Sequence, residues 1–131
     1  MSCNFFAGKI RNIKVTSKEL QYDGSVLVSR DLLDLAHIPA FAQVWVSNLT
    51  TGVRWLTYVL PTDEPGVFGL RGGETRYGEV GDDCLIIFYK NVDMFPGANV
   101  VFCGEQNTVK EIKQYDWQGN CDVIAEGGQL L

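Results

Sequence analysis

The most continuously apolar stretch of this sequence is Cys84-Leu85-Ile86-Ile87-Phe88-Tyr89. A run of this length without polar alternation is typical of a strand buried on both faces, so we place it at the centre of a sheet. Shorter runs with strand character lie on both sides of it, at 10–15, 25–28, 42–47, 53–60, 67–70 and 99–103. Many short strands predict a mainly β fold, in the form of a compact barrel.

Turn residues separate these runs. Tyr22-Asp23-Gly24 and residues 48–52 have turn composition, and 71–75 is too rich in glycine for a strand interior. A short helix is expected at 30–36, with Ser29 as its N-cap. The last expected strand is 99–103, and the pattern weakens after it. We therefore expect one domain, a barrel at 1–105, followed by an extension of uncertain structure at 106–131, in which 119–131 is a loose tail.

Composition excludes several classes of function. The chain has 131 residues, with 11 Lys and Arg against 16 Asp and Glu, a formal charge of −5. Its sequence pI of about 4.7 argues against nucleic-acid binding, which needs a basic surface. No apolar run approaches the roughly 20 residues of a membrane helix. The first residues lack the features of a signal peptide, so a cytoplasmic protein without membrane contact is expected.

Cysteine and histidine usage makes a metal site an unfavourable interpretation. The four cysteines, at 3, 84, 103 and 121, lie far apart, and the single histidine is His37. A structural zinc site needs closely spaced Cys and His ligands, so we expect no metal. The cysteines are expected to be free thiols, because disulfides are rare in the cytoplasm. His37 directly precedes Ile38-Pro39 and is expected at a helix end or on the surface.

Five fragments together resemble a known family. They cover about residues 5–103, in the family's order and with nearly its spacing, and the most specific are Tyr22-x-Gly24-Ser25 and Arg54-x-x-Thr57-Tyr58. The full set is Lys9-Ile10-Arg11, Val15-Thr16, Leu20-Gln21-Tyr22-Asp23-Gly24-Ser25, Arg54-Trp55-Leu56-Thr57-Tyr58 and Gly81-Asp82. The sequence is similar to pyruvoyl-dependent aspartate 1-decarboxylases. This resemblance implies a double-psi β-barrel with one or two short helices, and a homotetramer with sites between subunits.

The resemblance gives Gly24-Ser25 a chemical role. In the family, the serine hydroxyl attacks the preceding carbonyl, and elimination and hydrolysis then cut the chain and leave a covalent pyruvoyl group in place of Ser25. The ketone of that group condenses with a substrate amine, and the resulting imine accepts electrons as carbon dioxide leaves. A strained turn that holds a hydroxyl over its own carbonyl suits glycine, which has no Cβ. The alternative interpretation of Asp23-Gly24-Ser25 is an ordinary hairpin turn.

The strand at 53–60 carries further candidates. Arg54 and Tyr58 share one face of a regular strand, roughly 13 Å apart, from where long side chains can converge on a small substrate. Arg54 suits a bidentate bond to a substrate carboxylate. The resemblance implies that Tyr58 donates the proton that replaces the lost carboxyl group, and that Thr57, on the other face, assists self-processing. If both were structural, Arg54 would be solvated and Tyr58 would pack on the barrel.

Two candidates come earlier in the chain. The resemblance makes Lys9 a second cation for a dicarboxylate, whereas the alternative is a surface lysine on an edge strand. Tyr22 directly precedes the expected cleavage turn, where it can orient substrate, close the pocket or simply pack.

The match to the family fails at two places. Arg11 replaces the family's usual histidine and cannot give up its proton. The family pattern Asn-Gly-Ala-Ala-Ala becomes Arg71-Gly72-Gly73-Glu74-Thr75, where only Gly72 matches. We expect these residues to line the substrate site, Glu74 repelling an acidic substrate and Arg71 attracting one. Alternatively, Arg71 and Glu74 pair with each other.

Three hypotheses follow. The first is a self-processing decarboxylase whose substrate is a small acidic amino acid, aspartate, which it converts to β-alanine. The second is the same chemistry on a different amino acid. The third is a barrel that does not process itself and serves as a binding or assembly subunit, which the joint presence of all the matching site residues disfavours. A helper protein for maturation is compatible with the first two.

Overall fold

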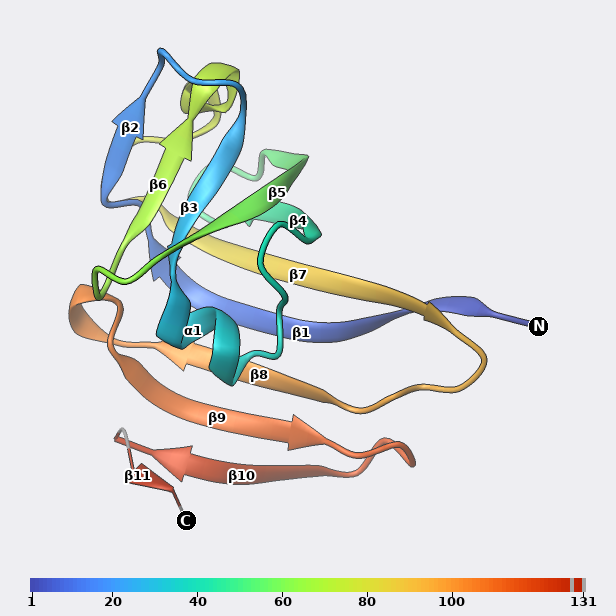
Figure 1. Ribbon diagram of the computed structural model, residues 1–131. Coiled ribbons are helices and arrows are strands. Elements are labelled where there is room, and N and C mark those ends of the chain that lie inside the picture. The colour runs from blue at the N-terminus through green and yellow to red at the C-terminus, as the bar shows by residue number, and fades with distance from the viewer. Residues whose placement is uncertain (128, 131) are drawn as a thin grey trace.

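The apolar stretch lies at the centre of the sheet. The computed structural model describes residues 1–127 and 129–130, and in this part of the chain the strands form an 11-stranded sheet in the order β11-β10-β9-β8-β1-β7-β4-β5-β3-β6-β2. β7 (Asp83–Val92) pairs antiparallel with β1 (Cys3–Lys14) and with β4 (Gln43–Asn48). Figure 1 shows β1 and β7 running together through the middle of the molecule. The central position predicted for 84–89 is therefore confirmed.

The other strands of the barrel have mixed pairing. β3 (Ser25–Ser29) is parallel to β5 (Arg54–Thr62) and antiparallel to β6 (Phe68–Arg71), and β6 is parallel to β2 (Ser17–Glu19). β1 is also parallel to β8 (Ala98–Cys103). Parallel neighbours need crossovers instead of tight hairpins, as a double-psi barrel requires. The mainly β fold with short helices is confirmed.

The predicted short helix is present as α1 (Arg30–Leu35), which buries Leu32 and Leu33. Ser29 occupies the N-cap position, but its hydroxyl does not cap the helix. Instead it donates to the carbonyl of Glu64 at 2.8 Å and accepts the N–H of Val67 at 2.7 Å. Ser29 therefore ties β3 to the loop before β6.

The C-terminal part of the chain corrects the sequence analysis. Instead of ending at 99–103, the sheet continues through η2 (Glu105–Asn107) into β9 (Val109–Tyr115), β10 (Cys121–Glu126) and β11 (Gln129–Leu130). β9 pairs with β8 and with β10, and the side chains of Ile112 and Ala125 are buried. The β9–β10 turn is closed by the Asp116 carboxylate, which accepts the N–H groups of Gln118 and Asn120, both at 2.9 Å. The loose tail expected at 119–131 is therefore wrong for its described residues, because this turn chemistry forms a hairpin.

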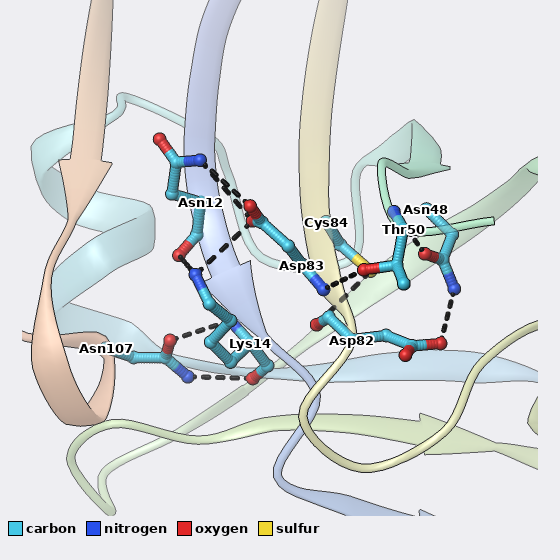
Figure 2. Close-up of polar contacts among 8 residues, drawn as sticks. All are labelled: Asn12, Lys14, Asn48, Thr50, Asp82, Asp83, Cys84 and Asn107. Carbon is cyan, nitrogen blue, oxygen red and sulfur yellow. Dashed lines mark hydrogen bonds and ion pairs between the residues drawn. The ribbon is translucent and has the colours of Figure 1, made fainter. Parts of the chain in front are cut away.

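Polar side chains fix the ends of β1 and β7 (Figure 2). Asp83 accepts from Asn12 at 3.1 Å and pairs with Lys14 at 3.5 Å, while Asn107 bonds both backbone groups of Lys14. The Asp82 carboxylate accepts from the Asn48 side chain at 2.9 Å, and this bond is the main cause of its lowered pKa. Asp82 of the family fragment Gly81-Asp82 thus has a structural role.

Cysteine and histidine lie as expected. The cysteines are free thiols, with Cys84 and Cys103 buried and Cys3 and Cys121 exposed. Burial raises the pKa of both Cys84 and Cys103 to about 12. His37 is exposed just after α1. Across residues 1–127 and 129–130, no helix is long and apolar enough to cross a membrane, and no three His, Cys, Asp or Glu side chains are grouped to hold a metal ion.

Candidate active site

The expected cleavage turn has an unusual environment. Gly24 adopts φ = +105°, a conformation that L side chains rarely adopt, and Ser25 begins β3 directly after it. The side chain of Ser25 is 0% exposed. Its Oγ is the one buried side-chain polar atom, among the residues that the structure describes, that has no hydrogen-bond partner. Leaving a hydroxyl buried and unbonded costs about 1–3 kcal/mol, so such an atom in a native fold calls for a reason.

The start of η1 (Gly72–Tyr77) packs against this turn. A Cβ on Gly72 would come within 2.7 Å of the Gly24 nitrogen and the Tyr22 carbonyl oxygen, so only glycine fits at this position. A Cβ on Gly24 would lie 3.8 Å from Oε2 of Glu74. Gly72 and Glu74 therefore adjoin the expected cleavage turn; Arg71 ends β6, and the residues after it form a 3-10 helix.

Glu74 points into the protein. It is 8% exposed, and its Oε2 accepts the hydroxyl proton of Thr57 at 2.7 Å while its Oε1 accepts the indole N–H of Trp55 at 3.2 Å. Burial raises the pKa of the Glu74 carboxyl, and the two hydrogen bonds offset part of that rise. We call Gly24, Ser25, Thr57, Gly72 and Glu74 the cleavage cluster, after the cut expected between Gly24 and Ser25.

Arg71 does not pair with Glu74, so that alternative is wrong. Its guanidinium lies 6.0 Å from the ring centroid of Tyr22 and donates to the Ser17 hydroxyl at 3.4 Å. Tyr22 is 56% exposed, and Gly73 is exposed as well. Arg71 is the β6 partner of Ser25, which places these residues around the cleavage turn. Arg71 and Glu74 thus differ: Arg71 lies against the exposed Tyr22, whereas Glu74 is buried.

Arg54 and Tyr58 lie on the outer face of β5. Along this strand Trp55, Thr57 and Val59 are buried, whereas the residues between them are exposed. The guanidinium of Arg54 stacks 4.6 Å from the ring centroid of Trp45 and donates to the Tyr89 hydroxyl at 3.4 Å. The predicted shared face of Arg54 and Tyr58 is therefore confirmed.

Tyr58 also neighbours the cleavage turn through the sheet. Val26 of β3 pairs with Val59 of β5, and both side chains are in the core. One residue back along these parallel strands, the register places Ser25 beside Tyr58, on the opposite face from the two valines. Tyr58 thus links the cleavage cluster to the outer face.

Lys9 also lies on the outer face, three strands from β5. It pairs with Ile87, which pairs with Trp45, and Trp45 pairs with Leu56 two residues after Arg54. β1 has neighbours on both sides, so the alternative of an edge-strand lysine is wrong. Lys9 Nζ lies 4.3 Å from the Phe6 ring centroid. Its pKa is lowered, mainly by burial and further by the nearby charge of Arg11.

The outer face contains an open cavity. It measures about 420 Å³, and its apolar lining includes Trp45, Leu56, Phe88 and Tyr89. We call Lys9, Arg54 and Tyr58, together with this cavity, the outer-face group. Most of the predicted site residues therefore belong either to the cleavage cluster or to the outer-face group, and Tyr22, Arg71 and Gly73 lie around the expected cleavage turn.

Sequence reasoning missed Trp55 as a member of the site. Its ring lies 5.2 Å from that of Tyr77, and its indole N–H reaches Glu74. A buried tryptophan usually finds a partner for this group. The sequence gives no indication of which acceptor is used, because the bond crosses from β5 to η1.

Comparison with known proteins identifies the family of this chain. The family model for aspartate decarboxylase matches residues 1–110. An aspartate 1-decarboxylase of Clostridium novyi is 33% identical over 121 residues, which cover 88% of this chain and 98% of the relative. Aspartate 1-decarboxylases of Campylobacter jejuni subsp. doylei and Clostridium beijerinckii are 33% and 34% identical, covering 92% and 88% of this chain and 98% of each relative. The chain belongs to the aspartate decarboxylase family.

Proposed function

We propose that this protein is a pyruvoyl-dependent decarboxylase of a small acidic amino acid, activated by cleavage of its own chain between Gly24 and Ser25. The observation that carries the proposal is the Ser25 hydroxyl, which is buried without a partner directly after a glycine at φ = +105°. An unbonded hydroxyl next to its own preceding carbonyl is free to attack it. The rest of the cleavage cluster supports this assignment.

The residues present fit the covalent group that such cleavage generates. Attack of Ser25 Oγ on the Gly24 carbonyl converts the peptide bond to an ester. Elimination then cuts the chain, leaving a carboxylate on Gly24, and hydrolysis consumes one water and releases one ammonia. The resulting pyruvoyl group supplies an electron sink for decarboxylation. Gly72 leaves room beside this turn, because any side chain there would collide with its backbone.

The outer-face group has the chemistry to bind and protonate a substrate. Arg54 offers two parallel N–H donors to a carboxylate, and stacking on Trp45 holds its guanidinium in place. Tyr58 holds a proton at its hydroxyl that can pass to the carbon from which carbon dioxide leaves. Glu74 bonds inward to Thr57 and Trp55, which removes the expected reason for it to repel an acidic substrate. This favours aspartate, on which the named relatives act, with β-alanine as product.

We further propose that copies of this chain assemble as a homotetramer, with each site between two subunits. Leu56 and Tyr58 are 47% and 37% exposed on the outer face, beside the apolar lining of the cavity. An exposed apolar surface of this kind is typical of an interface. A second copy packed there would bring an outer-face group toward a cleavage turn. Sedimentation of the purified protein tests this, since a monomer contradicts it.

The intact mass of the purified protein under denaturing conditions tests self-cleavage. We expect a fragment ending at Gly24 and a second that begins at residue 25 and is lighter by one ammonia than a free serine terminus. A cut protein is then offered aspartate, glutamate and neutral amino acids. Aspartate turnover no faster than the others would favour a different substrate. A chain that stays uncut, even after addition of a cell extract as a source of helper protein, would favour a binding or assembly subunit.

A further inference from the structure

Glu74 contacts two parts of the cleavage cluster at once. Its Oε2 holds the hydroxyl of Thr57 at 2.7 Å and lies 3.8 Å from the position that a Cβ would take on Gly24. The family pattern that the sequence resembles has a small residue at this position, whereas Glu74 brings a carboxyl group to the turn. A carboxyl group thus lies next to the α-carbon of the residue whose carbonyl is attacked.

The hydrogen bonds of Glu74 depend on its protonation. An ionised carboxylate only accepts, so Thr57 and Trp55 must both donate to it. The single hydroxyl proton of Thr57 is then committed. A protonated carboxyl group has a proton of its own, which it can donate to Thr57 Oγ1, leaving the Thr57 proton free to bond elsewhere.

We propose that Glu74 is a positioning residue for self-cleavage, which withholds the Thr57 hydroxyl proton when it is ionised and releases that proton toward the Gly24 carbonyl oxygen when it is protonated. This inference rests on the proposed function. In the step concerned, Ser25 Oγ bonds to the Gly24 carbonyl carbon, the C–N bond breaks, and the Oγ proton passes to the Ser25 nitrogen, so no atom is lost. The carbonyl oxygen gains negative charge on the way. A donated proton stabilises that charge, whereas an ionised carboxylate nearby repels it.

The surroundings of Glu74 allow this response to pH. Burial raises its pKa, so the protonated form persists above the range of an ordinary glutamate. The titratable or charged groups on the adjoining segments are Lys18 and Glu19 of β2, Tyr22 and Asp23 before the turn, Arg54 and Tyr58 of β5, Arg71 at the end of β6, and Arg76 and Tyr77 within η1. None of these forms a hydrogen bond or ion pair with Glu74 in the described part of the chain.

The test follows cleavage of the full-length chain made by cell-free synthesis and moved into buffers from about pH 5 to about pH 9, a range above the ordinary glutamate pKa. Intact mass gives the rate for the wild type and for Glu74→Gln, whose neutral amide can donate at every pH. We expect the wild-type rate to fall by up to about tenfold per pH unit above the Glu74 pKa. The Glu74→Gln rate should stay high and flat. Circular dichroism checks that both chains fold.

Two further variants test whether Glu74 acts through Thr57. Thr57→Val should cleave slowly at every pH. Adding Glu74→Gln to it should relieve the charge repulsion but not restore the fast rate of the Glu74→Gln single variant, because the Thr57 proton no longer exists. Trp55→Phe removes a bond that lowers the Glu74 pKa, so the fall in rate should move to higher pH. A role of Glu74 in packing alone would not shift this profile.

The outcomes separate the two proposals. A wild-type rate that rises with pH, with a slow Glu74→Gln, would make the carboxylate a base and overturn the positioning role. Matching profiles for the two chains would also overturn it while leaving self-cleavage intact. If none of the chains is cut at any pH, with or without cell extract, the proposed function fails and this inference fails with it.

Discussion

The cleavage cluster and the outer-face group are both built on β5, yet their surroundings differ. Thr57 is buried with Glu74 at the end of the barrel, whereas Tyr58, the next residue, is 37% exposed on the sheet surface. The two side chains diverge because successive residues of a strand point to opposite faces. One strand therefore serves two environments, one closed to solvent and one open.

This difference suits the two steps of the proposed chemistry. Attack of a hydroxyl on its own backbone occurs once and is favoured by a hydroxyl held away from solvent, as at Ser25. Turnover needs a surface that substrate can reach, as at Arg54. We therefore expect substitutions inside to change maturation, and substitutions outside to change catalysis in a normally cut protein.

The largest effect is expected for Ser25→Ala. Without the hydroxyl no ester can form, so the intact mass should show one uncut chain without decarboxylase activity. Ser29→Ala is the matched control, since Ser29 is equally buried on β3 but fully bonded. It should be cut normally and lose about 1–3 kcal/mol of unfolding free energy through its unpaired partners. A cut Ser25→Ala chain would contradict the self-cleavage proposal.

Tyr58→Phe should leave cleavage intact and lower kcat by about 10²–10⁴-fold, the usual contribution of a positioned proton donor. Intact mass and steady-state kinetics on the same sample separate the two effects. Normal kcat in a cut protein would show that the proton comes from elsewhere. Failure of cleavage would instead assign Tyr58 to the cleavage cluster. The register of β3 and β5 is compatible with this result, because it places Tyr58 beside Ser25.

The Arg54→Ala protein should also be cut, but its KM should rise, or its kcat/KM fall, by roughly 10–100-fold. This change corresponds to the loss of charge-assisted hydrogen bonds worth about 1.5–3 kcal/mol. Arg30→Ala serves as control, because Arg30 is paired with Asp63 beside α1. Its kinetics should match the wild type. Equal kinetics for Arg54→Ala and Arg30→Ala would remove Arg54 from the substrate site.

The smallest effect concerns stability rather than activity. Burial raises the pKa of folded Glu74, so the folded chain holds this proton more tightly than the unfolded chain. The contribution of this proton to the free energy of unfolding is complete below the pKa of Glu74 in the unfolded chain. It is lost as pH rises through the pKa of Glu74 in the folded chain. Urea unfolding of Ser25→Ala, with and without Glu74→Gln, measures this in uncut chains. Glu74→Gln should flatten the fall of unfolding free energy with pH, and identical slopes would argue against a raised pKa.

The local pattern predicted seven strands between residues 10 and 103 and the faces of β5, but not the short β2 or every side-chain partner. Alternation places Arg54 and Tyr58 together, and it needs no knowledge of the rest of the fold. The inward orientation of Glu74 could not be predicted, because Glu74 lies in η1 and its partners Thr57 and Trp55 lie on β5, which is distant in the sequence. The same limit applied to Arg71, which was free to pair with Glu74 by spacing but lies against Tyr22.

The error at the C-terminus has a different origin. β9 has no two adjacent apolar residues, and the apolar run of β10 is the short Val123-Ile124-Ala125, so the apolar pattern that indicates a strand is weak in both. Their pairing is favoured by the Asp116 turn and by β8, which already offers an edge. Turn residues at 116–120 were the local indication that could have revealed the hairpin.

The position of β1 between β7 and β8 sets what a cut after Gly24 does to the folded protein. Residues 1–24 contain β1 and β2, so the shorter piece stays held by strands of the longer one instead of leaving. Folding of the continuous chain is unimolecular, whereas reassembly of the two pieces is bimolecular. The thermal midpoint of the cut protein therefore rises with protein concentration even apart from subunit assembly. Such a protein folds readily once, before the cut. After unfolding of the cut protein in denaturant, its two pieces refold poorly when the denaturant is diluted.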